Sequence, residues 1–208
     1  MPQITYDARS LMVNGRRTAI SGAGVEYVAM DPSLRGSILR SFAALGFNTI
    51  LASCPWHLHE PMPGRFSVDG RLDVGGFCRD AEALGLRTSL GVGPGVGAPF
   101  DGGGIPTWMS DRPEVEARSG SSEFLELVSR WFARLAEQLV DLQADRDGGG
   151  PLIAIQVEHD WQCGSAESGE AYMRELVRYA RERGFTVPIL TSNGFWSQTE
   201  GAVETWTG

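Results

Sequence analysis

Short apolar runs rich in branched residues alternate along the chain with segments whose apolar positions recur every three or four residues. The short runs are typical of strands buried on both faces, and the longer pattern is typical of amphipathic helices. The runs predict strands within residues 19–30, 48–54, 86–92, 152–157 and 187–191, with a further strand at 202–206. The periodic segments predict helices at residues 31–45, 72–84, 123–143 and 170–183.

Strand–helix units that repeat in this way build either an open doubly wound sheet or a barrel, because right-handed crossovers between parallel strands permit few other arrangements. No Gly-x-Gly-x-x-Gly turn follows the first strand, so a dinucleotide-binding fold has no support. A long Gly/Pro-rich connection runs from Gly93 to about Ser121, and connections of this length are usually functional or disordered. No linker or internal repeat divides the chain, and we expect residues 1–208 to form a single domain.

The composition limits the partners that the chain is expected to have. Of its 208 residues 42% are hydrophobic, and the formal net charge is -8 without any basic run, which argues against nucleic acid. No apolar run approaches the ~20 residues that a membrane span needs. The N-terminus lacks the basic and apolar regions of a signal peptide, so we expect a cytoplasmic protein. Three widely spaced cysteines do not suggest a disulfide framework.

The most informative segment is the end of the fourth predicted strand, where Glu158, His159 and Asp160 directly follow an apolar run. In an α/β barrel, active sites form at this end of the strands. Glu158 and Asp160 are two residues apart, so on an extended segment both carboxyl groups point to one side. One of them could act as a general acid if burial raises its pKa. The alternatives are that Glu158 orients a neighbour, or that the run is simply the polar start of a loop.

A second candidate segment, residues 54–64, follows the second predicted strand and carries Trp56, His57 and His59. An indole beside polar groups suits a sugar ring, which stacks its apolar face on the aromatic and forms hydrogen bonds through its hydroxyls. The alternative is that Trp56 belongs to the core. All three histidines of the chain, including His159, lie at predicted C-terminal strand ends. As a set they favour a functional pocket, whereas each one alone could be structural.

At these residues the chain resembles glycoside hydrolase family 35, whose characterised members are mostly β-galactosidases on an (α/β)₈ barrel. The resemblance extends over nearly the whole chain, with its motifs in the order of the family. These motifs lie at residues 14–16, 21–22 with Tyr27, 45–49, 55–64, 93–94, 103–108, Arg118, 149–158 and 187–191.

The resemblance implies a TIM-type (β/α) barrel that is incomplete here, with about six strands present. The family motif Glu-Asn-Glu-Tyr reads Glu158-His159-Asp160-Trp161, which puts Asp160 in the position of the family's acid/base. The nucleophilic Glu of the family follows strand seven, which this sequence does not contain. We therefore expect Asp160 and Glu158 to be the catalytic residues. The expected substrate-binding residues are Tyr27, Trp56, His57, Ala98, His159 and Trp161.

Several positions depart from the family's pattern. Asp160 is one methylene shorter than the family's Glu, and a shift of about 1 Å can cost a large factor in rate. The family's Cys-Ala-Glu turn reads Gly97-Ala98-Pro99, and a nearby tyrosine is replaced by Gly95. The family's His-Tyr after the first strand reads Glu26-Tyr27.

Three functional interpretations follow. The first is a glycoside hydrolase that cleaves terminal β-galactosides by carboxylate acid/base chemistry, with a small-molecule or oligosaccharide substrate and neither cofactor nor metal. The second is another enzyme on the same scaffold, with a metal or acid/base pocket formed by Glu26, His57, His59, His159 and Asp160. The third is a carbohydrate-binding protein without catalytic activity.

All three interpretations share two structural expectations. Glu26, His57, Asp160 and the loop after Gly93 should converge at one face of the molecule, because that face collects the C-terminal ends of the strands. The open edges of the sheet should favour a homo-oligomer, or a second chain that completes the barrel.

Overall fold

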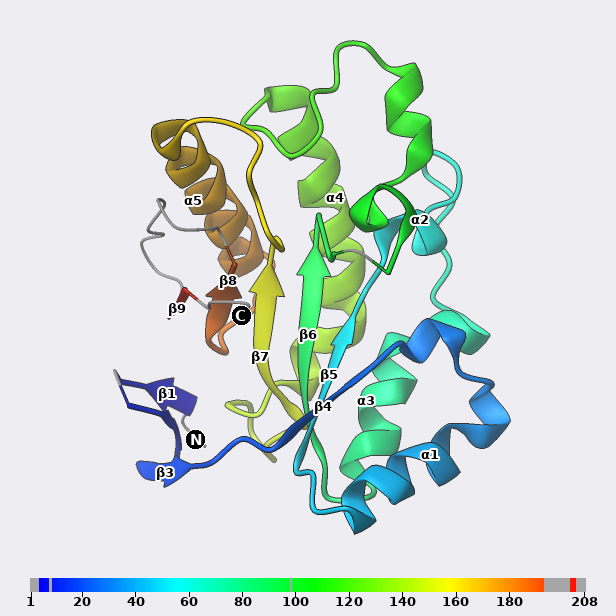
Figure 1. The fold of residues 1–208 in the computed structure, drawn as a ribbon, viewed down its shortest axis with the longest axis vertical. Coiled ribbons are helices and arrows are strands. Elements are labelled where there is room, and N and C mark those ends of the chain that lie inside the picture. Colours follow the sequence, from blue (N-terminus) through cyan, green and yellow to red (C-terminus); the bar gives the residue numbers. More distant parts are fainter. Residues whose placement is uncertain (1–3, 8, 98, 193–202, 205–208) are drawn as a thin grey trace.

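The computed structural model describes residues 4–7, 9–97, 99–192 and 203–204. Its main element is a parallel sheet of six strands whose spatial order follows their order in the sequence (Figure 1). The strands are β4 (Gly22–Val25), β5 (Thr49–Ser53), β6 (Arg87–Gly93), β7 (Leu152–Val157), β8 (Ile189–Thr191) and β9 (Val203–Glu204). Each lies within one residue of its predicted range, so the predicted α/β class and its strands are confirmed.

Four longer helices alternate with these strands and pack side by side in chain order. They are α1 (Pro32–Ala44), α3 (Val74–Glu82), α4 (Ser122–Leu139) and α5 (Ala166–Glu182). Each begins where a side chain accepts a hydrogen bond from a free backbone N–H of the first turn. The capping residues are Asp31, Asp73, Ser121 and Ser165. The helix α5 begins four residues before its predicted start, because the cap at Ser165 precedes a first turn without apolar periodicity.

An N-terminal antiparallel sheet was not predicted from the sequence. It consists of β1 (Ile4–Tyr6), β2 (Leu11–Val13) and β3 (Arg16–Thr18), which are too short to show a clear alternation. Asn14 and Gly15 both have positive φ angles, 51° and 71°, which is the geometry of a tight hairpin turn. This small sheet lies near the N-terminal ends of the parallel strands (Figure 1), where Ile4 packs with Ala144 and Ile153.

The connection between β6 and α4 is ordered by short turns rather than by regular strands or long helices. It contains the 3₁₀ turns η3 (Asp101–Gly104) and η4 (Thr107–Asp111). The indole of Trp108 donates a hydrogen bond to the Glu60 carbonyl oxygen at 3.0 Å, which ties the connection to the short helix α2 (Trp56–His59) and the turn after it. The predicted functional loop is therefore held over the C-terminal ends of β5 and β6.

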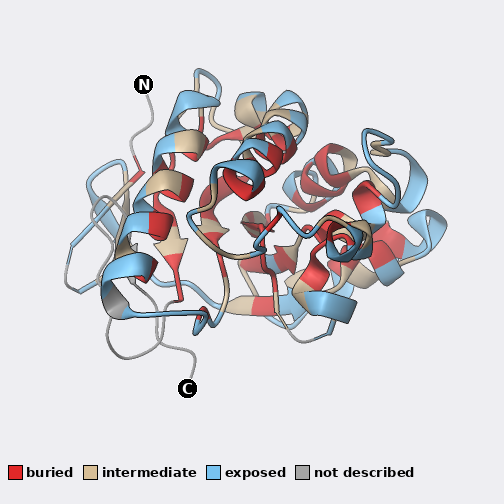
Figure 2. Ribbon diagram, turned by 90° about the horizontal axis from the view of Figure 1, so that it is seen from above, coloured by how far each residue is buried: buried red, intermediate tan, exposed pale blue. Residues whose placement is uncertain are grey.

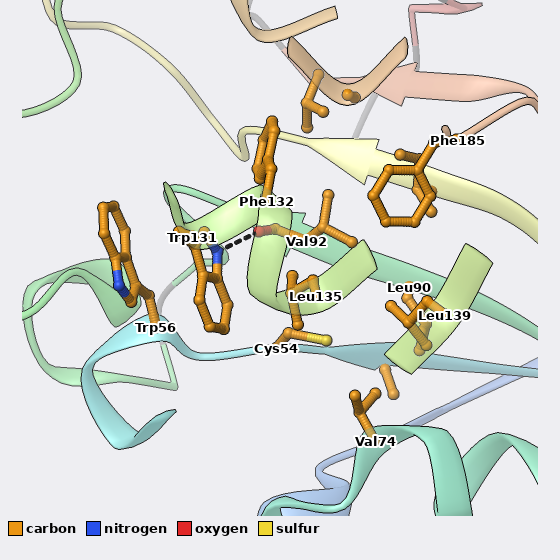
Figure 3. Packing of buried hydrophobic residues seen from close by; sticks show 14 of the residues in the cluster. Cys54, Trp56, Val74, Leu90, Val92, Trp131, Phe132, Leu135, Leu139 and Phe185 are labelled. Carbon is orange, nitrogen blue, oxygen red and sulfur yellow. Dashed lines mark hydrogen bonds between the residues drawn. The ribbon is translucent and has the colours of Figure 1, made fainter. Parts of the chain in front are cut away.

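The core lies between the sheet and the helices, where the buried residues face one another (Figure 2). Two of its largest side chains, Trp56 and Trp131, stack on each other, with ring centroids 5.7 Å apart and planes 7° from parallel. The indole N–H of Trp131 donates a hydrogen bond to the Val92 carbonyl oxygen at 2.8 Å (Figure 3). This bond joins α4 to the end of β6, so the aromatic cluster fixes the helix against the strand end that begins the long connection.

The opposite face of the sheet is less covered. Leu51 in the middle of β5 is 43% exposed, and a mostly apolar pocket of about 320 Å³ lies between the strand starts and the N-terminal sheet. Among the described residues, β4 and β9 each pair with a neighbour on one side only. Self-association was predicted from such open edges, and it stays a prediction. No helix in the described part of the chain combines the length and apolar character needed to cross a membrane.

Replacing Trp131 with Ala is expected to lower the free energy of unfolding by about 3–5 kcal/mol, because a fully buried aromatic ring is lost and the Val92 carbonyl loses its donor. Urea denaturation followed by circular dichroism measures this loss. Leu45→Ala is the control, since Leu45 is 74% exposed and should change stability little. A similar, small effect of both substitutions would contradict the assigned role of Trp131.

Candidate active site

A pocket of about 440 Å³ opens at the C-terminal ends of the parallel strands. Its wall includes Glu26 after β4, Ser53 at the end of β5, Gln156 in β7 and His159 beyond it. Gly95 contributes from the long connection. A smaller pocket adjoins it through Gly95 and His159 and is lined by further residues that include Asp160. The predicted convergence is thus found for Glu26, the loop and Asp160, whereas His57 lines neither of these two pockets.

Asp160 contacts polar groups of its own loop and of the segment after β8. Its Oδ1 accepts a hydrogen bond from the Ser192 hydroxyl at 3.0 Å, and its Oδ2 lies 3.4 Å from Nε2 of His159. The amide of Gln156 donates to Nδ1 of His159 and also to the Glu158 carbonyl oxygen. Because Nδ1 then accepts a bond, a neutral His159 carries its proton on Nε2, facing Asp160. The Asp160 side chain is 52% exposed, so its carboxyl remains open to a ligand.

Glu158 has a different environment, and the predicted parallel orientation of the two carboxyl groups is not observed. The Glu158 side chain is fully buried, accepts a hydrogen bond from Tyr172 at 2.6 Å and pairs with Arg118 at 2.8 Å. Burial, and then the adjacent Glu158 charge, raise the pKa of Tyr172 well above its ordinary value, so its phenol remains a donor. The expectation that Glu158 is catalytic therefore finds no support in its position, which matches the alternative of a buried acceptor that orients its neighbours.

The backbone explains why the two carboxyl groups separate. Glu158 and Asp160 have φ angles of 59° and 47°, in the left-handed region that residues other than glycine adopt at a cost. The segment is therefore not extended, and the alternation assumed from its sequence does not apply. Arg118 stabilises this turn by donating to the His159 carbonyl oxygen at 2.6 Å, while the Trp161 indole donates to the Arg118 carbonyl oxygen at 2.8 Å.

The three aromatic residues expected to bind substrate lie in the core. Tyr27 and Trp56 are 0% exposed and Trp161 is 1% exposed, so none of them offers a ring face to the pocket. Trp56 stacks on Trp131, as described above, and donates its indole N–H to Glu60 at 2.7 Å. These residues support the site from behind. Ala98, the remaining expected contact, lies outside the described residues.

The histidines do not form one cluster. His59 is buried, donates from Nδ1 to the Ser67 carbonyl oxygen and accepts the Tyr27 hydroxyl at Nε2, 2.6 Å away. Burial is the main cause that lowers the pKa of His59 to about 4, so the ring is neutral. His57 packs near Phe100, with ring centroids 5.9 Å apart. No group of three or more His, Cys, Asp or Glu in the described part of the chain is placed to hold a metal ion.

Gly95 and Gly97 leave the space that the side chains of Glu158 and His159 occupy. A Cβ atom on Gly95 would lie 2.7 Å from the Glu158 carboxylate, and one on Gly97 would lie 2.7 Å from the His159 ring. Gly97 also has a φ angle of 102°, which disfavours any side chain. The loss of side chains from this turn therefore makes room for His159 and for the ion pair of Glu158.

Four residues of the site were not predicted as functional: Arg118, Gln156, Tyr172 and Ser192. The position of Gln156 could have indicated a role, because a polar residue within a buried apolar strand requires a hydrogen-bond partner. Arg118 belonged to a family motif, but the sequence did not show what it contacts. Tyr172 and Ser192 had no such signal, since their partners are distant in the sequence.

The parallel strands, the covering helices and the pocket at the strand ends define an α/β fold of the TIM-barrel type. The fold is similar to that of the exo-beta-1,4-mannosidase Op5Man5 from Opitutaceae bacterium strain TAV5, with a TM-score of 0.65 and 20% identity over 84% of this chain and 32% of that one. It is also similar to the beta-galactosidase from the psychrophilic Marinomonas ef1, with a TM-score of 0.64 and 13% identity over 83% of this chain and 37% of that one. At these identities the similarity shows the fold alone.

Sequence comparison shows the family. Residues 10–206 match the model of glycosyl hydrolases family 35, and the chain belongs to this family. It is 34% identical over 185 residues to human Beta-galactosidase-1-like protein 2, an alignment that covers 89% of this chain and 28% of the relative. The chain thus spans about a quarter of the length of the relatives it matches. The family resemblance inferred from the motifs is confirmed.

Arg118→Met is expected to lower the free energy of unfolding by about 3–5 kcal/mol, because it leaves the buried Glu158 carboxylate without its cation. Glu158→Gln should cost less, since Arg118 keeps the His159 carbonyl as a partner and its side chain is 24% exposed. Urea denaturation at neutral pH gives both values. The control is Arg178→Met on the surface of α5, where little change is expected. An Arg118→Met variant as stable as this control would contradict the structural role of the pair.

His59 gives a prediction about pH. The folded protein holds this ring neutral down to about pH 4, whereas in the unfolded chain it takes up a proton near its ordinary pKa of 6.5. The unfolded state thus binds more protons between these values, and the free energy of unfolding should fall by about 3 kcal/mol as the pH drops through this range. In His59→Gln this contribution should vanish, while His57→Gln should retain it. Denaturation series over this pH range test the difference, and equal slopes in both variants would refute the assignment.

Proposed function

We propose that the chain forms the proton-donor side of a glycosidase site that acts on terminal β-galactosides. The observation that carries this proposal is the position of Asp160. The family resemblance assigns it the acid/base position, and its carboxyl is half-exposed beside the strand-end pocket while Glu158 is fully engaged in an ion pair. The preference for β-galactosides is taken from relatives such as the human Beta-galactosidase-1-like protein 2.

The chemistry requires Asp160 to protonate the glycosidic oxygen while the bond to the anomeric carbon breaks. The carboxylate that remains is stabilised by the Ser192 hydroxyl at 3.0 Å, with His159 Nε2 3.4 Å away. The same carboxylate then removes a proton from the water that completes hydrolysis. In a retaining mechanism the second carboxyl lies about 5–5.5 Å from the first, and the family resemblance places it after a seventh strand, which this sequence does not contain.

A second candidate is a carbohydrate-binding protein that does not hydrolyse its ligand. The observation that favours it is the shorter side chain at position 160, which holds the carboxyl further back than a glutamate would. Binding in the pocket does not require that proton to be transferred. The two candidates therefore differ in turnover and not in sugar binding.

Asp160→Asn is expected to lower the rate of disaccharide hydrolysis by ~10²–10⁴-fold, because the amide keeps the shape of the side chain but has no proton to donate. Aryl galactosides with good leaving groups should be affected less, since they need little protonation. The assay uses the protein that carries these 208 residues, with lactose and nitrophenyl galactoside as substrates. Asp141→Asn, at an exposed position in the turn after α4, is the control.

Two outcomes would decide against the proposed role of Asp160. Undiminished lactose hydrolysis by Asp160→Asn would show that another group is the proton donor. Wild-type protein that binds galactosides but cleaves none of them would favour the second candidate.

A further inference from the structure

Glu26 is a carboxyl group in the pocket that neither the fold nor the proposed proton transfer uses. It directly follows β4, at a position where the family's pattern has a histidine, and it lines the same pocket as Gln156 and His159. Its Oε2 is shielded from solvent and accepts no hydrogen bond from any described residue. Burial raises the pKa of this carboxyl above its ordinary value. The group is therefore incompletely solvated in the unliganded protein.

The surroundings of Glu26 do not neutralise its charge. No arginine is among the described residues that line this pocket. The other carboxylate in the wall, Glu158, already pairs with Arg118, and His159 faces Asp160. Ser53, Ser89 and Gln156 add neutral polar groups. A ligand in the pocket thus meets, at the end of β4, a carboxyl group that no described cation in the wall accompanies, beside neutral donors and acceptors.

Glycines in the wall leave room for a ligand beside Glu26. Gly24, Gly91 and Gly95 line the pocket without side chains, and a Cβ added to Gly24 would meet nothing within 4 Å. A sugar ring can therefore approach the backbone closely beside Glu26. A donor on the ring, either a hydroxyl or an ammonium group, then gains a charge-assisted hydrogen bond to an under-solvated acceptor.

We propose that Glu26 is a specificity-determining residue of this pocket and selects a neutral or cationic glycosyl unit against an acidic one. The inference rests on the proposed function in that the pocket is taken to bind a sugar. A hydroxyl or amine on the ring donates to the carboxylate, whereas a uronate brings a second negative charge into a pocket without a cation. Amino sugars should therefore bind most tightly, neutral sugars less tightly and uronates least.

A binding role and a structural role of Glu26 predict opposite effects on stability. Glu26→Gln keeps the size of the side chain and removes a charge that is costly to bury, so the variant should be as stable as the wild type or more stable. If Glu26 instead held the fold together, the same change would destabilise the protein. A loss of ligand discrimination without loss of stability would therefore identify a binding residue.

The experiment measures binding of the methyl β-glycosides of galactose, galactosamine and galacturonic acid by isothermal titration calorimetry at neutral pH. The wild type is expected to bind the amine at least about tenfold more tightly than the uronate, with the neutral glycoside between them. Glu26→Gln should reduce the ratio of the two dissociation constants to within about threefold. The control is Glu167→Gln in the first turn of α5, which should retain the wild-type ratio because Glu167 does not line the pocket.

Each possible result bears on one of the two proposals. A wild type that binds the neutral and acidic glycosides equally, or a Glu26→Gln variant that keeps the full discrimination, overturns the role of Glu26 and leaves the sugar pocket in place. A marked fall in the melting temperature of Glu26→Gln assigns the residue a structural role instead. Failure of all three glycosides to bind overturns both the proposed function and this inference.

Discussion

The arrangement of the site depends on the buried ion pair between Arg118 and Glu158. Arg118 comes from the long connection after β6, and Glu158 directly follows β7, so the pair joins two segments that are 40 residues apart. A carboxylate with 0% side-chain exposure is tolerated only if a cation and further donors satisfy it, and Arg118 and Tyr172 supply these. The same guanidinium also holds the His159 carbonyl, which fixes the backbone from which His159 and Asp160 project.

These contacts explain how the turn from Glu158 to Asp160 can adopt a backbone conformation that is unfavourable on its own. Glu158 and Asp160, on either side of His159, both have a left-handed backbone, which costs of order 1–3 kcal/mol at each residue. The bonds to Arg118 on one side and the Ser192–Asp160 bond on the other compensate this cost. The turn separates a buried carboxylate, that of Glu158, from a half-exposed one, that of Asp160. Two acidic residues of the same short motif thus have different environments, set by the backbone of the turn and by their side-chain partners.

Much of the fold could be predicted from the sequence because its signals are local. The run from Leu152 to Val157 is a buried strand with the predicted bounds, and Asp31 caps α1 where its sequence indicates. The site was less predictable, since it depends on side-chain direction. An indole beside polar residues suits a sugar-binding surface, but Trp56 lies in the core. There its ring stacks on Trp131 and its N–H donates a hydrogen bond to Glu60. No local pattern indicates that distant partner.

Most buried polar groups named here have hydrogen-bond partners, whereas a few have none among the described residues. Behind the pocket, His59, Glu60 and Glu158 have their buried polar atoms bonded to specific partners. At the strand ends, one oxygen of Glu26 and Nδ1 of His57 are buried without a hydrogen bond among the described residues. A folding protein gains nothing from such atoms, because each one loses its hydration without replacement. Arg35 and Arg146 also each have a buried Nε without such a bond, and neither lines the pocket, so Glu26 is distinguished by its position in the pocket wall together with its missing partner.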